Sequence, residues 1–263
     1  MKISSLANIH PEAIIAENVV IEAFATIGKE VEIGEGSWIG PNAVIFSGSR
    51  VGQNCKIFPG AVIGADPQDL KYAGEETHVV IGDNVVVREY CTINRGTAAY
   101  GKTVVESNIL LMAYVHVAHD CHIKSGCILS NAVNLAGHVI VNENTIIGGM
   151  TAIQQFVRIG QYCYIGGGSK VRKDIPPFVK AARDPISYVG VNRIGLDRNG
   201  FETDAISRIQ DIYRCLYVKG WNITQAISHI ASDMPGSPEK QIILDFINSS
   251  EGGIMRGFNS LSE

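Results

Sequence analysis

The sequence predicts a mainly β protein: a parallel β-helix built from hexapeptide repeats, followed by a small α-helical C-terminal region. Three observations support this prediction. Ile, Leu or Val fills 26 of the 29 positions reached by stepping in sixes from Ile3 to Val171. Glycine is frequent, with 28 residues, and only 7% of the residues are aromatic. After Thr203 the spacing of the apolar residues becomes helical.

The six-residue period indicates how the first part of the chain folds. It fits neither an α-helix nor a flat strand, but it fits a short strand plus a bend, with three hexads closing one triangular coil. The repeated aliphatic residue fills the axis of this prism, and a small or β-branched residue four positions later, such as Val31 or Ser37, lets the corner close. At an inter-strand spacing of about 4.8 Å, at most about ten coils give a prism roughly 45 Å long.

Two segments keep the phase of the repeat but lose its aliphatic residues. Residues 65–79 (ADPQDLKYAGEETHV) are polar and charged, and residues 95–103 (RGTAAYGKT) are polar and contain glycine. We interpret both as loops that leave the prism, and a loop that interrupts so regular a solenoid is expected to be functional. The predicted domains are residues 1–177, which form the β-helix with these loops, and residues 178–263.

The C-terminal region follows a different pattern. Pro176 and Pro177 are predicted to end the repeat, and residues 178–200 are interpreted as an irregular, partly basic connector. Three helices are expected after it: one from Thr203 to a stop at Gly220, one over about 223–233 with Ile223, Ile227 and Ile230 facing inward, and one with Ser237 as N-cap that ends near Ser249.

The composition excludes several classes of protein. A net charge of −4 and a pI near 6.0 argue against a general nucleic-acid binder. No apolar run approaches the about 18 residues that indicate a transmembrane segment, and the N-terminus has no signal-peptide pattern. There is no CxxC pair, and five cysteines occupy the small inward position of the hexad: Cys55, Cys91, Cys121, Cys127 and Cys163. These features predict a cytoplasmic protein with reduced cysteines.

The segment HVAHDCH contains the densest group of titratable side chains. His119 lies two residues after the inward Val117, so its ring should face outward, beside the carboxylate of Asp120. His138 follows Asp120 by one full coil and should stack over it. A histidine next to a carboxylate suits a general base, because its ordinary pKa is about 6.5 and the carboxylate fixes its tautomer.

Other interpretations of the charged groups stay open at this point. A zinc site of the gamma carbonic anhydrase type would use three histidines across a subunit boundary, although the His-x4-His pair of that type is absent. A purely structural role is the alternative for His119 and, more strongly, for His122, which shows no obvious partner in the sequence. Lys170, Arg172 and Lys173 form either a solvated rim or a dock for an acidic or phosphorylated partner.

Six segments together resemble one family: HVAHDC, LAGH, QDLKYAGE, IIGGMTA, GVNRIGL and RNGF. It is the family of acyl-carrier-protein–UDP-N-acetylglucosamine O-acyltransferases, and the resemblance spans nearly the entire chain. The resemblance implies a left-handed β-helix, an exception to the right-handed crossover rule, and a homotrimer with active sites between neighbouring prisms. It implies transfer of an (R)-3-hydroxyacyl group from acyl carrier protein to the 3-hydroxyl of UDP-N-acetylglucosamine, the first step of lipid A biosynthesis, without a metal or other cofactor.

The resemblance also implies roles for individual residues. His119 is the general base, Asp120 orients it, and the N–H of Gly137 faces the developing oxyanion. The remaining positions contact the substrates: His116 and His138 as polar walls, Gln68, Asp69 and Lys71 around the acyl 3-hydroxyl, Gln155, Asn192 and Arg198 around the nucleotide, Gly167 beside the end of the acyl chain, and Lys170, Arg172 and Lys173 facing the acidic carrier. Three positions depart from the family, in which His, Glu and Arg are common: Gln154, Ile194 and Asn199.

Several alternatives remain beside this one. The N-acyltransferase of the same pathway carries an additional N-terminal domain, whereas the repeat here begins by Ile3. A coenzyme-A-dependent sugar O-acetyltransferase would use a different acyl donor. From other classes, a zinc-dependent protein like gamma carbonic anhydrase would need a bound metal, and a non-catalytic β-solenoid scaffold would not depend on His119.

Overall fold

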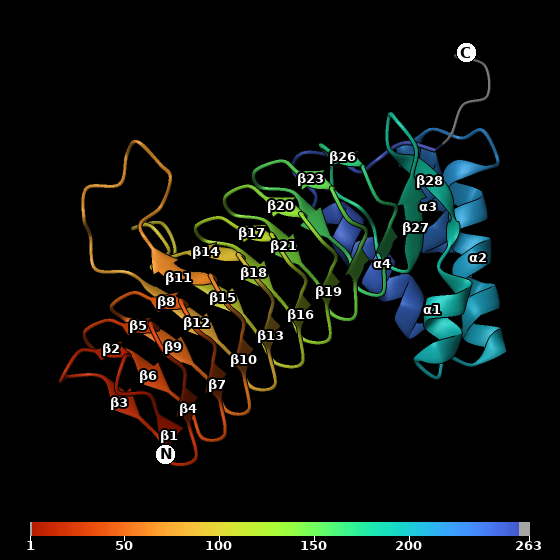
Figure 1. Cartoon of the computed structure of the whole chain (residues 1–263). Coiled ribbons are helices and arrows are strands. Elements are labelled where there is room, and N and C mark those ends of the chain that lie inside the picture. The colour runs from red at the N-terminus through yellow and green to blue at the C-terminus, as the bar shows by residue number, and fades with distance from the viewer. Residues whose placement is uncertain (1, 258–263) are drawn as a thin grey trace.

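The structure is a computed structural model that describes residues 2–257, and it consists of a long triangular column followed by a helical cap (Figure 1). Within these residues, 28 short strands form the three faces of the column and four helices follow them along the chain. Every strand pairing in the column is parallel, and the last strand, β28, returns antiparallel to β27. The predicted parallel β-helix is therefore confirmed.

The strands are distributed over three sheets, one for each face. The first face contains β1 (Lys2–Ile3), β4 (Val20–Ile21), β7 (Trp38–Ile39), β10 (Lys56–Ile57), β13 (Val86–Val87), β16 (Leu110–Leu111), β19 (Ile128–Leu129), β22 (Ile146–Ile147), β25 (Tyr164–Ile165), β27 (Val179–Ala182) and β28 (Ser187–Val191). The second contains β2 (Asn8–Ile9), β5 (Thr26–Ile27), β8 (Val44–Ile45), β11 (Val62–Ala65), β14 (Thr92–Asn94), β17 (His116–Val117), β20 (Asn134–Leu135), β23 (Ala152–Ile153) and β26 (Lys170–Val171). The third contains β3 (Ile14–Ile15), β6 (Glu32–Ile33), β9 (Ser49–Val51), β12 (His78–Ile81), β15 (Lys102–Val105), β18 (His122–Ile123), β21 (Ile140–Val141) and β24 (Arg158–Ile159).

The coils stack so that the repeated aliphatic residues lie above one another. Leu111 pairs with Leu129 and Leu129 with Ile147, a step of one coil each time. All three side chains are fully buried and belong to a core that continues along the column. Because burying one such side chain stabilises a fold by about 1.5–3 kcal/mol, the hexad repeat itself supplies the main stabilisation of the column.

Two coils are longer than the others, and they contain the two predicted loops. Ile57 pairs with Val87 and Ile93 with Val117, so these coils are longer by two hexads and by one hexad. The first loop (66–77) lies between β11 and β12, and the second loop (95–101) between β14 and β15. Since whole hexads are added, the phase is kept, and the loops contain all three breaks in the aliphatic series: Asp69, Glu75 and Ala99.

The segment after the two prolines is not the irregular connector that the sequence predicts. β27 extends the first face by pairing with β25, and β28 forms a hairpin with β27. A short helix, α1 (Arg193–Arg198), follows, with Asn192 as its N-cap. The prediction was wrong because the chain keeps burying apolar side chains here, among them Phe178 and Val179, after the six-residue period has ended.

The three predicted helices are present as α2 (Thr203–Tyr217), α3 (Ile223–Asp233) and α4 (Pro238–Asn248). The predicted N-cap of α4 is confirmed, since Ser237 Oγ accepts a hydrogen bond from the Lys240 N–H at 3.2 Å. In α3, Ile230 is buried as predicted, whereas Ile223 is 36% exposed. Ile223 is the first residue of its helix and follows the exposed segment around Trp221, so its predicted inward orientation is wrong.

The cysteines agree with the sequence-based expectation of reduced, inward-facing thiols. All six cysteines are free and buried, including the five that were assigned to the inward position of the hexad. Burial raises the pKa of the five thiols of the column, to about 11 for Cys91 and about 12 for Cys121 and Cys127. Among the residues that the structure describes, no helix is both long and apolar enough to cross a membrane.

Candidate active site

His119 lies at the corner of the column that follows β17. The backbone turns there because Asp120 adopts a left-handed conformation with φ of +60°, as residues at many corners of the column do. His119 Nδ1 lies 2.8 Å from Asp120 Oδ2. An ionised carboxylate can only accept a hydrogen bond, so the shared proton belongs on Nδ1 and Nε2 keeps its lone pair. This is the tautomer that a general base needs.

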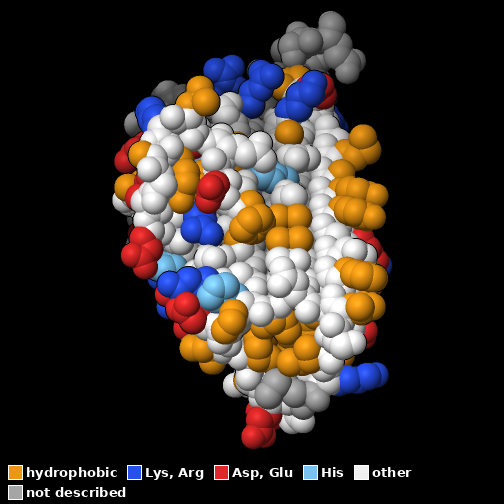
Figure 2. Space-filling view, turned by 60° about the vertical axis from the view of Figure 1, so that its left-hand side comes forward, with side chains coloured by type: hydrophobic (Ala, Val, Ile, Leu, Met, Phe, Trp, Pro, Cys, Tyr) orange, Lys and Arg blue, Asp and Glu red, His pale blue; other side chains and the backbone are white. Residues whose placement is uncertain are grey.

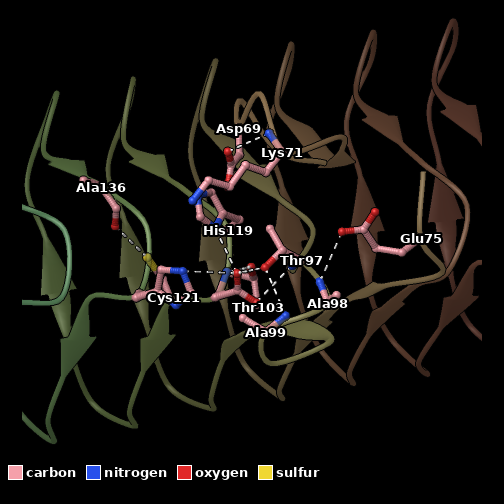
Figure 3. A network of polar contacts seen from close by, with 12 residues as sticks. Asp69, Lys71, Glu75, Thr97, Ala98, Ala99, Thr103, His119, Cys121 and Ala136 are labelled. Carbon is pink, nitrogen blue, oxygen red and sulfur yellow. Dashed lines mark hydrogen bonds and ion pairs between the residues drawn. The ribbon is translucent and has the colours of Figure 1, made fainter. Parts of the chain in front are cut away.

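The His119 ring leaves the core as predicted, but it is less open than an outward-facing side chain suggests. Only 7% of the residue is exposed. The His138 ring stands perpendicular to it, with the ring centroids 5.1 Å apart. Figure 3 shows the first loop, with Asp69 and Lys71, on another side of the ring. The base therefore lies in a sheltered crevice, where polar interactions are stronger than in water.

Gly137 forms the floor beneath the His119 ring. A Cβ atom built on Gly137 would lie 2.5 Å from Cε1 and 2.6 Å from Nε2 of that ring. Real Cβ atoms do not approach other atoms so closely, so any side chain here would displace the ring. The Gly137 carbonyl accepts a hydrogen bond from the Phe156 N–H at 3.2 Å, which fixes this backbone on the next coil. The site thus requires glycine at position 137.

The Asp120 carboxylate is held by the second loop as well as by His119. Thr97 donates to it twice, from its N–H to Oδ1 at 3.0 Å and from its hydroxyl to Oδ2 at 2.6 Å. Burial disfavours the charged carboxylate, but the hydrogen bonds from Thr97 and His119 outweigh it and lower the pKa of Asp120. Thr103 Oγ1 accepts from the Asp120 N–H at 2.8 Å. Sequence reasoning did not single out Thr97 or Thr103, although both lie within the loop that it predicted at residues 95–103.

His138 stacks above Asp120, as the one-coil spacing predicts. Its Nε2 lies 3.7 Å from Asp120 Oδ2, and its ring packs on Phe156 with centroids 4.7 Å apart. Tyr100 of the second loop contacts the same ring edge-on at 5.2 Å. Burial lowers the pKa of His138, although the Asp120 charge opposes this shift, so the ring favours its neutral form. Within the described residues His138 Nδ1 is buried without a hydrogen-bond partner, which leaves it available to a ligand.

The other two histidines of the segment differ in their surroundings. His116 lies on β17, directly before the corner that holds His119. Its Nδ1 is 2.7 Å from Thr92 Oγ1, and burial lowers its pKa. His122 lies on the third face, with Nε2 2.7 Å from Glu106 Oε1. The expectation that His122 lacks a partner is therefore wrong: the ordinary one-coil step pairs Val104 of β15 with His122 of β18 and leaves Glu106, two residues further on, within reach of its ring. A structural ion pair accounts for His122.

Backbone N–H groups of both loops donate hydrogen bonds to carboxylates of the first loop and hold it near the crevice. The Lys71 N–H donates to Asp69 Oδ1 at 3.0 Å, and the Asp69 charge acts on the imidazole of His138. The Glu75 carboxylate accepts from the Ala73 N–H at 2.8 Å and from the Ala98 N–H of the second loop at 3.3 Å. The two loops are thus tied to each other, and the predicted acyl-contacting residues Asp69 and Lys71 lie beside His119 (Figure 3). Gln68 is exposed on the same loop.

A cavity of about 430 Å³ opens beside His138 and leads toward the basic group. Its walls include Gln154, Gln155, Arg172 and Lys173. Lys173 Nζ also donates to the Gly252 carbonyl at 3.0 Å, whereas Lys170, 3.7 Å from Asp184, does not line the cavity. Figure 2 shows several Lys and Arg side chains gathered near the top of the view. The structure therefore connects part of the predicted docking group with the crevice.

The crevice also contains a set of atoms that could ligate a metal ion. One ligand atom each from His119, Asp120 and His138 lies within 4.8 Å of the others. This set has two imidazoles and a carboxylate, unlike the three histidines of the zinc alternative. In the structure the Asp120 oxygens already accept hydrogen bonds from Thr97, so a metal ion would compete with those bonds.

Comparison with known proteins assigns the chain to a family. A family model described as UDP N-acetylglucosamine O-acyltransferase, domain 2, matches residues 174–255, and a model of the GMPPB C-terminal domain matches residues 3–109. A protein of Stenotrophomonas maltophilia (strain R551-3) named acyl-(acyl-carrier-protein)–UDP-N-acetylglucosamine O-acyltransferase is 42% identical over 257 residues, which cover 97% of this chain and 98% of that protein. The chain belongs to this O-acyltransferase family.

Solved structures of this O-acyltransferase family share the fold over almost the whole chain. The UDP-N-acetylglucosamine acyltransferase of Bacteroides fragilis 9343 aligns with a TM-score of 0.94 at 50% identity, covering 96% of this chain and 99% of that one. The enzyme of Francisella novicida aligns with a TM-score of 0.95 at 37% identity, covering 98% and 95%. The predicted fold class, a left-handed parallel β-helix followed by a small α-helical C-terminal region, is thereby confirmed.

Two of the three positions assigned to the nucleotide, Asn192 and Arg198, lie away from His119 within one chain, whereas Gln155 lines the cavity beside His138. The Asn192 amide is buried, donates to the Tyr162 carbonyl at 2.9 Å and accepts from the Gly195 N–H at 3.3 Å. Arg198 lies exposed at the end of α1. Tyr162 marks the corner after the third face, whereas His119 lies at the corner after the second. The single chain therefore does not bring these residues together.

The position assigned to the end of the acyl chain is a stretch of bare backbone. A Cβ atom on Gly167 would lie 3.1 Å from the Gly149 carbonyl oxygen, and one on Gly149 would lie 3.0 Å from the Asn131 carbonyl oxygen. Two stacked coils thus both carry glycine at this place. Sequence reasoning selected Gly167 and overlooked Gly149, although the motif IIGGMTA contains it.

Proposed function

We propose that this chain transfers an (R)-3-hydroxyacyl group from acyl carrier protein to the 3-hydroxyl of UDP-N-acetylglucosamine, the first step of lipid A biosynthesis. The observation that carries the proposal is the His119–Asp120 pair on the Gly137 floor, with Nε2 of the imidazole left as an acceptor. The family membership supports the choice of substrates, since the relatives are named for acyl carrier protein and UDP-N-acetylglucosamine.

The geometry suits acyl transfer by general base catalysis. Nε2 of His119 takes the proton from the sugar 3-hydroxyl while its oxygen attacks the thioester carbonyl carbon. The carbonyl oxygen becomes an oxyanion that the Gly137 N–H stabilises; within the described residues this N–H donates to no protein acceptor. Collapse breaks the carbon–sulfur bond, and the leaving thiolate takes the proton back from the imidazolium. The ester, the free carrier thiol and neutral His119 result, so protons and electrons balance.

We further propose that a homotrimer completes each site. The His138 ring stands against the His119 ring, and Asp69 and Lys71 lie beside it in Figure 3, whereas Asn192 and Arg198 lie at a different corner of the column. A neighbouring column packed against the crevice would supply these nucleotide-binding residues from its α1. Exposed apolar side chains at four corners after the first face offer a surface for such packing: Phe24, Tyr90, Tyr114 and Met150.

The remaining proposed contacts are those with the acyl chain, the nucleotide and the carrier protein. Gly167 and Gly149 leave room for the end of the acyl chain, while Gln155 lies in the cavity beside His138. The acidic carrier docks on Lys170, Arg172 and Lys173. We place the reaction in the cytoplasm, because both donor and acceptor are cytoplasmic metabolites and all six thiols are free.

The proposal is tested by an in vitro assay that pairs UDP-N-acetylglucosamine with acyl carriers of several chain lengths. His119→Ala should lower turnover about 10²–10⁴-fold, because a positioned base typically contributes this much. Chromatography of the variant should show an unchanged oligomer. More than a few per cent of residual activity in His119→Ala would refute the assignment of the base.

Two further arms of this assay separate the alternatives. A coenzyme-A-dependent acetyltransferase would accept acetyl-coenzyme A and ignore the acyl carriers. For the zinc alternative, elemental analysis of the purified protein should find metal in proportion to protein, and chelation should abolish activity. The proposal expects activity with the carrier-bound hydroxyacyl donor that a chelator leaves unchanged.

A further inference from the structure

Two donors, His119 and Thr97, share one oxygen of the Asp120 carboxylate. Oδ2 lies 2.8 Å from His119 Nδ1 and 2.6 Å from Thr97 Oγ1, while Oδ1 accepts from the Thr97 N–H at 3.0 Å. Asp120 is 2% exposed and Thr97 is 9% exposed, so water competes little for these bonds. Hydrogen bonds to an ionised group are about twice as strong as those between neutral groups. Thr97 therefore makes strong contacts with the partner of the base.

The second loop fixes both the place and the proton of the Thr97 hydroxyl. The Gly101 N–H donates to the Thr97 carbonyl at 2.7 Å, and the Ala99 N–H donates to Thr97 Oγ1 at 3.3 Å. Because Oγ1 accepts from Ala99, its own proton is free to point at Asp120. A Cβ atom on Gly96 would lie 2.3 Å from the Lys102 nitrogen, so the chain can approach Thr97 only through glycine at position 96. The local sequence thus holds the hydroxyl in one orientation.

We infer that Thr97 is a positioning residue for the acyl transfer, acting through Asp120 to fix the orientation and tautomer of the His119 ring. This inference rests on the proposed function, in which His119 is the base. With Thr97 in place, Asp120 cannot rotate without losing two hydrogen bonds, so Nδ1 of His119 stays paired and Nε2 faces the substrate. Thr97 itself touches no reacting atom.

Other charged groups around the carboxylate do not perform this task. His138 Nε2 is 3.7 Å from Oδ2, beyond hydrogen-bond distance, and Asp69 acts on the His138 imidazole. Glu75 reaches the second loop only through the Ala98 N–H at 3.3 Å. Thr103 accepts from the Asp120 backbone and leaves the carboxylate free. Among the described residues, Thr97 and His119 make the hydrogen bonds to the Asp120 carboxylate.

The test is a double-mutant cycle in the whole protein, with Thr97→Val and Asp120→Ala. Valine keeps the shape and the backbone N–H but removes the hydroxyl, so kcat should fall about tenfold, as expected for the loss of a hydrogen bond to a charged group. In the Asp120→Ala background the same change should have no further effect, because the partner is already absent. KM for both substrates should stay within about twofold of the wild type, since ground-state contacts are retained.

Two matched variants separate positioning from packing. Thr97→Ser keeps the hydroxyl and should restore kcat to within about twofold of the wild type. Thr145→Val removes another buried hydroxyl, one that bonds only to backbone, at Gly160 and Cys163, and should leave kcat unchanged even if Tm falls. In Thr97→Val the acidic limb of the pH profile of kcat/KM should move to higher pH. Without the Thr97 hydroxyl the His119–Asp120 pair has one hydrogen-bond donor fewer, and it takes up a proton more readily.

The outcomes distinguish this inference from the function on which it rests. Wild-type kcat in Thr97→Val, additive losses in the cycle, or a Thr97→Ser variant as slow as Thr97→Val would each overturn the role of Thr97. If His119→Ala is inactive while Thr97→Val is unaffected, only this inference fails. If His119→Ala keeps its activity, the proposed base is wrong and the role of Thr97 fails with it.

Discussion

The chemistry of the crevice depends on the fixed position of the His119 ring, which has close neighbours on several sides. Asp120 holds Nδ1, Gly137 lies beneath Cε1 and Nε2, and His138 stands against the side of the ring. These contacts come from two successive coils, so the stacking of the column sets the position of the base. A misplacement of about 1 Å can reduce a rate about a hundredfold, which makes each contact consequential.

Gly137→Ala tests the floor of the crevice. The added methyl group would overlap the His119 ring, since the Cβ position is 2.5 Å from Cε1. The ring must swing away from Asp120, so turnover should fall at least about a hundredfold while Tm changes little. Gly236→Ala, which has open space around its Cβ position, no positive φ and a place outside the site loops, serves as the control for added bulk. An active Gly137→Ala enzyme would show that the ring tolerates displacement.

Some residues of the site could be predicted from the sequence because the repeat fixes their position. His138 follows Asp120 by one coil, and that spacing alone places one above the other, as observed. Thr97 could not be found in this way, because the second loop leaves the coil before reaching Asp120. The Glu106 partner of His122, in contrast, follows from the ordinary one-coil register of β15 on β18 and could have been predicted from the spacing.

At the scale of elements, the hexad predicts the strands but says little about segments without a period. The column and its two loops follow from the spacing of the aliphatic residues. The hairpin of β27 and β28 has no six-residue period, yet it continues the first face because its apolar side chains still find the end of the core. The family resemblance, rather than the period, pointed to the left hand of the helix.

The end of the column suggests a test of carrier docking on β26. Lys170 lies on this strand and Arg172 directly follows its end, whereas Lys173 is better left unchanged because it donates a hydrogen bond to the Gly252 carbonyl. Lys170→Glu with Arg172→Glu should raise KM for the acyl carrier at least about tenfold and leave KM for the sugar nucleotide unchanged, with the difference shrinking at high salt. Lys56→Glu on β10 is the matched control. Equal losses for both substrates would contradict docking at this surface.

At the scale of the whole molecule, one column holds the base while the nucleotide residues lie on another corner. Asn192 is fixed to Tyr162 by a hydrogen bond of 2.9 Å and cannot turn toward His119 of its own chain. A ring of three columns with head-to-tail contacts would place the α1 of one copy against the crevice of the next. Catalysis would then be a property of the interface and not of a single chain.

Mixing two inactive variants, His119→Ala and Arg198→Ala, tests this central claim most directly. In randomly assembled trimers, each site takes its base from one copy and its Arg198 from the neighbour, so about one quarter of the sites regain both residues. We expect no activity from either variant alone and about one quarter of the wild-type activity after co-assembly. Co-assembled trimers that stay inactive would contradict a site shared between neighbouring columns.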